Sequence, residues 1–162
     1  DPRYAEHWWK LAEKLVSNSL YVSDNVAALT VLCGNVSAIC EALGPATARY
    51  MRPFVGRLTK GLHSPANMNP KLCQLHQVSL EQIKAIVKAC PQRIHVYAAE
   101  IIAALAYSWT TAKGASSDNV DQLKVSITDL IKTLHQICPD ETKRAVSQLV
   151  ESGTVADWQN IV

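Results

Sequence analysis

Apolar residues recur at helical spacing along most of the chain, in segments that proline and glycine separate. The clearest apolar pattern follows positions i, i+3, i+4, i+7, i+8, i+11 and i+15: Ile94, Tyr97, Ala98, Ile101, Ile102, Leu105 and Trp109. This spacing places the apolar side chains on one face of an α-helix. No strand-like alternation competes with it, so we predict an all-α protein.

The same pattern predicts seven helical segments, at about residues 3–20, 24–43, 45–62, 70–90, 94–113, 119–138 and 140–152. Pro53 should kink the third helix, because an interior proline removes a backbone donor. Asn119 stands three residues before Gln122, a spacing that resembles a capping box at the start of the sixth helix. Four apolar residues near the end should form a final turn that docks on the domain: Val155, Trp158, Ile161 and Val162.

Short connections make successive helices antiparallel neighbours. Units at 45–90 and 91–138 have lengths close to the repeat of HEAT proteins, which is about 40–47 residues. We therefore expect helical hairpins stacked as a HEAT-like α-solenoid, with a compact helical bundle as the alternative. The chain should form a single α-helical repeat domain over residues 1–162. Because Asp1 replaces an initiator methionine, we expect it to be a fragment of a longer α-solenoid.

Composition points to a folded protein with no strong overall charge. Hydrophobic residues make up 48% of the 162 residues, and 16 basic against 14 acidic side chains leave a net charge of +2. This balance predicts no general attraction to nucleic acid or membrane. The five cysteines are an odd number without a C-x-x-C pair, which favours reduced thiols in an intracellular protein. We also expect no signal sequence and no apolar run long enough to span a bilayer.

Sequence motifs give no support for catalysis, a cofactor or a metal, and we expect the protein not to be an enzyme. Gly56 and Gly61 have the gap of a phosphate-binding loop, but Leu62 and His63 follow where Lys and Ser or Thr are required. A zinc site would need two pairs to converge, Cys73 with His76 and His135 with Cys138. The favoured interpretation of these residues is structural, because Cys is often buried as a small hydrophobe. The favoured interpretation of Glu81 and Glu100 is that they lie on solvated helix faces.

Two groups of residues are candidates for binding a partner. No acid occurs between Glu41 and Glu81, whereas five basic residues do: Arg49, Arg52, Arg57, Lys60 and Lys71. They could dock an acidic or phosphate-bearing partner. The favoured alternative is that they surround an apolar stripe with their charged ends in water. Nucleic acid is not favoured, since no aromatic residues are interleaved with the cations.

The second group is aromatic: Trp8, Trp9 and Trp158. One helix cannot point both Trp8 and Trp9 into the same core, so one ring should lie at a margin, and Trp158 near the terminus poses the same question. These rings could contact another chain. The favoured alternative is that missing neighbouring repeats would cover them.

Four stretches carry a resemblance to a known family: Tyr50 to Leu58, Ser79 to Ile83, Cys90 to Ile94, and Glu100 to Ile102 with Trp109. Together they resemble the C-terminal part of the Tel-two-interacting protein Two family. Cys90 and Gln92 depart from that family's tryptophan-proline-arginine turn. The resemblance covers about residues 45–112 of this chain.

The resemblance implies an α-solenoid scaffold, a subunit of the Triple T co-chaperone complex, with no catalytic residues to transfer. The implied partners are two other helical-repeat subunits, the chaperone machinery and the large phosphatidylinositol-3-kinase-related kinases, in the cytoplasm or nucleus. Two alternatives stay open. One is a generic HEAT or armadillo adaptor that binds cargo proteins, and the other is a phosphate or nucleic-acid binder that uses the basic residues.

Overall fold

The computed structural model describes residues 6–8, 10–11, 13–14, 25–63, 68–113 and 117–161. These residues form helices and short connections, and no strand occurs among them. The α-helices are α2 (Val26–Gly34), α3 (Val36–Leu43), α4 (Met51–Leu62), α5 (Pro70–Ala89), α6 (Ala98–Ala112), α7 (Asp118–Ile137) and α8 (Pro139–Glu151). Three 3-10 helices join them or follow them, η1 (Gly44–Arg49), η2 (Pro91–Val96) and η3 (Ala156–Asn160). The prediction of an all-α protein is confirmed.

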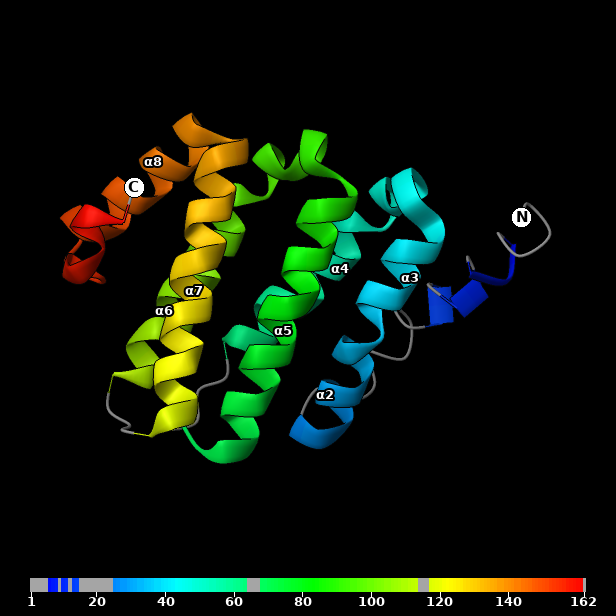
Figure 1. Cartoon of the computed structure of the whole chain (residues 1–162), viewed down its shortest axis with the longest axis horizontal. Coiled ribbons are helices and arrows are strands. Elements are labelled where there is room, and N and C mark those ends of the chain that lie inside the picture. Colours follow the sequence, from blue (N-terminus) through cyan, green and yellow to red (C-terminus); the bar gives the residue numbers. More distant parts are fainter. Residues whose placement is uncertain are drawn as a thin grey trace.

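The helices pack in two layers (Figure 1). In one layer α5 lies between α2 with α3 on one side and α7 on the other. In the second layer α4 lies beside α6. The layers are joined because α4 packs on α5 and α6 packs on α7, and α8 covers the end formed by α6 and α7. Side chains buried between the layers form one continuous core.

Helix α5 begins and ends where the sequence predicts. The side chain of Asn69 accepts a hydrogen bond from the Leu72 backbone N–H at 3.0 Å, and Pro70 occupies the first helical position. Proline suits that position because a first-turn N–H has no intrahelical acceptor. At the other end, Cys90 caps the helix and Pro91 starts the next segment.

The predicted second helix is wrong as a single element, because it divides at Asn35 into α2 and α3. The Asn35 side-chain amide donates to the Val31 carbonyl at 2.7 Å. Asn is favoured at such points because its side chain competes for backbone carbonyls. The predicted start at Ser23 and Asp24 lies outside the described residues, and the observed N-cap is Asn25.

Pro53 does not interrupt a helix interior as predicted. Helix α4 begins at Met51, so Pro53 lies in its first turn. Its missing N–H therefore costs no intrahelical hydrogen bond. The prediction for Asn119 is also wrong: α7 begins at Asp118 with Ser117 as N-cap, and Asn119 is inside the helix.

The C-terminal apolar turn docks as predicted. Val155 and Trp158 are fully buried, and the Trp158 ring meets Trp109 of α6 edge-on, with centroids 5.9 Å apart and planes at 75°. Gly153, with φ of +75°, ends α8 and lets the chain turn back onto it. Val162 lies outside the described residues.

One expectation about membranes needs correction. By length and composition alone, the helical run Val26–Arg49 could cross a bilayer. In the structure this run is broken at Asn35, and its buried side chains, including Leu29, Cys33 and Ile39, face the core where α2 and α3 pack on α5. In the most apolar window of this run, 33% is buried in the structure.

Candidate partner-binding surface

The five basic candidates are spread over η1, α4 and α5. Arg49 ends η1, while Arg52 and Lys60 are exposed on α4, about 12 Å apart along its axis. Lys71 lies in the first turn of α5. Arg57 is half-buried, and one of its guanidinium nitrogens, Nη2, is buried without a hydrogen-bond partner among the described residues. Arg57 is therefore part of the packing, whereas Arg52, Lys60 and Lys71 are exposed.

Acidic side chains from other helices reach this basic segment. The Thr59 hydroxyl of α4 donates to Oε1 of Glu100 in α6 at 3.0 Å. The interpretation of Glu100 as only a solvated residue is therefore incomplete, because it links two helices of the same layer. Burial raises the pKa of Tyr50, and the Glu13 carboxylate nearby raises it further. The acid-free stretch of sequence is thus flanked in space by Glu13 and Glu100.

The three tryptophans have different surroundings. Trp8 is half-buried and packs against the core. Trp9 lies outside the described residues. Trp158 has no exposed surface, so its ring is not accessible to a partner in the chain as folded here. Its apolar ring closes the end of the core instead.

An exposed apolar surface on α2 and the first turn of α3 was not predicted from the sequence. Residues 25–40 carry no charged side chain. Val31 is 68% exposed, and Ala27, Gly34 and Ala38 are exposed at helical spacing around it. Val125 of α7 is similarly exposed, at 61%, but Asp121, Lys124 and Asp129 surround it in the sequence. We call the surface of Ala27, Val31, Gly34 and Ala38 the α2 face.

The zinc alternative is wrong because its two pairs lie far apart. The Cys73 thiol lies 3.5 Å from the Asn119 carbonyl at the start of α7, whereas Cys138 follows the end of that helix. Nineteen residues of helix correspond to about 28 Å. His76 turns elsewhere, with Nδ1 2.8 Å from the Ser108 hydroxyl. No group of three or more metal-ligating side chains occurs in the described part of the chain.

The described thiols are buried, and each is protonated at neutral pH. Burial raises the pKa of Cys40 to about 11 and raises the pKa of the other four cysteines as well. A thiolate is the reactive form of cysteine. These side chains therefore serve as small apolar packing groups.

Comparison of the chain with protein-family models, with curated proteins and with solved structures found no match. The class that the structure defines is an all-α protein of paired helices in two layers. Membership of the Tel-two-interacting protein Two family stays a prediction.

Proposed function

We propose that this chain is a protein-protein interaction scaffold whose helical hairpins stack as a HEAT-like α-solenoid. An internal repeat supports the stacking. The first helices of two successive hairpins start at Met51 and Ala98, 47 residues apart, and the second helices start at Pro70 and Asp118, 48 residues apart. This period lies at the upper end of the HEAT range.

The repeat extends to the connections. A six-residue 3-10 helix precedes both α4 and α6, and a tyrosine, Tyr50 or Tyr97, follows each of them. Both second helices end in a Cys-Pro pair, Cys90 with Pro91 and Cys138 with Pro139. Matching turns in matching places favour a repeated unit over a bundle of unrelated helices.

The α2 face is the observation that carries the binding function. Interface centres are apolar and depleted in charge, while their rims are polar. Val31 at 68% exposure stands in a 16-residue stretch without charge, 25–40. Glu41 lies just beyond its end. This arrangement suits the apolar side of an amphipathic helix from a partner.

The resemblance supports a specific assembly. The chain would be a subunit of a complex like the Triple T co-chaperone, bound to two other helical-repeat subunits, and would support the maturation of phosphatidylinositol-3-kinase-related kinases in the cytoplasm or nucleus. A generic HEAT or armadillo cargo adaptor is the alternative. A phosphate or nucleic-acid binder is less favoured, because Glu13 and Glu100 flank the dispersed cations.

The test compares the proteins that co-purify with three forms of the chain: wild type, Val31→Glu and Val125→Glu. Both valines are exposed, so neither change should unfold the protein, and circular dichroism checks this. We expect two large helical-repeat proteins and kinase-associated chaperone factors with wild type and Val125→Glu, and at least about tenfold less of them with Val31→Glu. Equal recovery with all three forms would show that α2 is not the interface. Recovery of many unrelated cargo proteins would favour the adaptor.

A further inference from the structure

A groove of about 410 Å³ lies between the first turns of α5 and α7. Val78 of its lining neighbours Gly34 of the α2 face, where an added Cβ would lie 3.8 Å from Val78 Cγ1. Its walls come from both helices: Pro70, Cys73, Gln74, Gln77 and Val78 from α5, with Asn119 and Gln122 from α7. The volume falls in the range of small-ligand sites, about 300–1,000 Å³.

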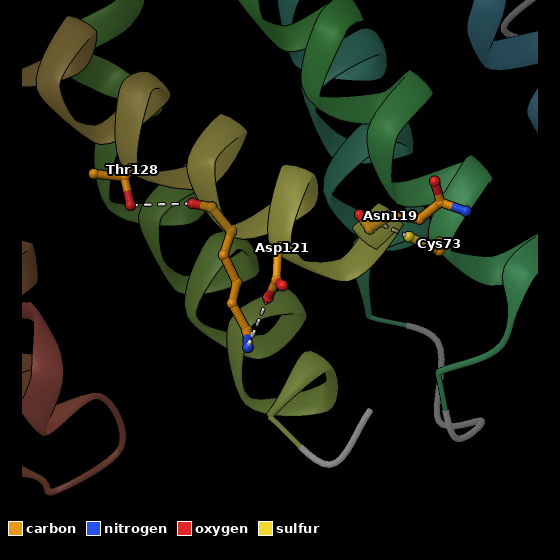
Figure 2. Close-up of polar contacts among 5 residues, drawn as sticks. Cys73, Asn119, Asp121 and Thr128 are labelled. Atoms are coloured by element: carbon orange, nitrogen blue, oxygen red, sulfur yellow. Dashed lines mark hydrogen bonds and ion pairs between the residues drawn. The ribbon is translucent and has the colours of Figure 1, made fainter. Parts of the chain in front are cut away.

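Two contacts hold the groove in shape. Figure 2 shows Cys73 of α5 facing the first turn of α7, where its thiol donates to the Asn119 carbonyl at 3.5 Å. Further along, the Gln77 side-chain amide donates to the Ser126 hydroxyl of α7 at 3.0 Å. The two walls are therefore fixed relative to each other at both contacts.

The lining is uncharged and rich in carboxamides. Four of its seven residues are Gln or Asn, and three of these, Gln74, Asn119 and Gln122, are exposed at the surface. Burial raises the pKa of the Cys73 thiol, which keeps it neutral. The nearest charges along the two helices are opposite in sign: Lys71 lies three residues before Gln74 on α5, and Asp118 lies four residues before Gln122 on α7. The Asp121 carboxylate points toward Lys124 and lies 3.9 Å from its Nζ (Figure 2). The groove thus offers hydrogen bonds without a net charge.

One side-chain oxygen of a lining residue, Oε1 of Gln77, has no protein donor. The amide nitrogen of Gln77 donates to the Ser126 hydroxyl, whereas Oε1 is buried and has no hydrogen-bond partner among the described residues. An unpaired buried acceptor is costly, so a ligand N–H that reached Oε1 after a small movement of the lining would relieve that cost. The hydrogen bond to Ser126 fixes the position of the amide nitrogen of Gln77.

We propose that this groove binds an uncharged peptide segment in an extended conformation, through hydrogen bonds from the carboxamides to its main chain. Each carboxamide carries the same donor and acceptor groups as a peptide bond and can pair with one. A helical segment uses its own N–H groups internally, whereas an extended one presents free N–H and C=O groups along its edge. The lining has no charged side chain, and Lys71 and Asp118 beside it balance each other, so the groove gives no net attraction to an acidic or a basic segment.

The test uses an array of N-acetylated, C-amidated heptapeptides made from Ala, Ser, Leu, Val, Asn and Gln, with acidic and basic arrays beside it. Binding of the best peptide to the whole chain is measured by fluorescence polarisation. We expect about tenfold weaker binding by the double variant Gln74→Ala, Gln122→Ala, and no change in the control Gln136→Ala, an exposed residue of α7 outside the groove. We also expect that N-methylation of at least one main-chain nitrogen of the peptide weakens binding by about tenfold, because it removes the donor.

The proposal is overturned if no uncharged peptide binds, if the double variant binds as well as the control, or if every N-methylated peptide binds like the parent. A preference for the charged arrays would overturn it too. The Val31→Glu variant separates this site from the scaffold function, since it should still bind the peptide. If the partner proteins are not recovered but the peptide still binds, the groove proposal holds and the scaffold proposal fails. If the partner proteins are recovered but the peptide does not bind, the scaffold proposal holds and the groove proposal fails.

Discussion

Acidification from pH 7 to pH 5 should destabilise the protein through His76. This side chain is fully buried between α5 and α6, with Nδ1 2.8 Å from the Ser108 hydroxyl and Nε2 without a partner among the described residues. Burial lowers the pKa of His76 to about 4, and the nearby His63 adds to the effect. A charged imidazole would be poorly solvated there, so the folded protein keeps it neutral.

The free energy of unfolding falls with pH because the unfolded chain binds the proton at a higher pH than the folded protein does. In the unfolded chain the pKa of His76 returns to 6.5. As the pH falls below 6.5, the unfolded chain takes up a proton that the folded protein refuses until about pH 4. Stability therefore decreases through this window and levels off below it. Between pH 7 and pH 5 the free energy of unfolding should fall by about 2 kcal/mol from this residue alone.

The assay is urea unfolding at half-unit steps from pH 7.5 to pH 5, followed by circular dichroism, for wild type, His76→Gln and His95→Gln. The glutamine at position 76 cannot titrate, so that variant should lose about 2 kcal/mol less than wild type over the same steps. His95 is exposed, and its variant should follow the wild-type curve. If His76→Gln shows the same pH dependence as wild type, the assigned low pKa of His76 is refuted.

Three further substitutions test the packing, each by urea unfolding. Gly153→Ala should cost about 1 kcal/mol, because Gly153 has φ of +75° and a Cβ disfavours that conformation. Thr59→Val should cost about 1 kcal/mol, because it removes the hydroxyl that donates to Glu100. Trp158→Ala should cost about 3–5 kcal/mol, because it empties the fully buried site against Trp109. If a variant shows no measurable loss in the free energy of unfolding, the conformation or contact that it tests does not stabilise the protein as stated.

The helical seams and most of their limits could be predicted from the sequence, because they depend on local chemistry. Pro70 and Pro91 mark the ends of α5, and the apolar seam from Ile94 to Trp109 is the buried side of η2 and α6. Such signals act within one or two turns, so one sequence contains all of the information they need.

The errors came where the outcome depends on a register or on a distant helix. Whether Pro53 kinks a helix depends on where that helix starts, and η1 delays the start of α4 to Met51. Whether Glu100 is only solvated depends on which helix lies beside α6, and α4 brings the Thr59 hydroxyl to it. The apolar periodicity of one segment does not predict which other helices lie beside it in a layer.

The same reasoning explains why the α2 face was missed and why it matters. An uncharged apolar run predicts a buried helix. Helix α5 carries four charged side chains, yet it has neighbours on both sides in its layer and buries ten of its 20 residues. Helix α2 is at least as apolar in composition, yet it buries only Leu29 and Cys33. Exposure here is set by the helix's place in the layer and not by its residue types. A residue such as Val31 therefore keeps a core-like side chain in contact with solvent, and a partner helix that packs there would complete for α2 the burial that α7 completes for α5.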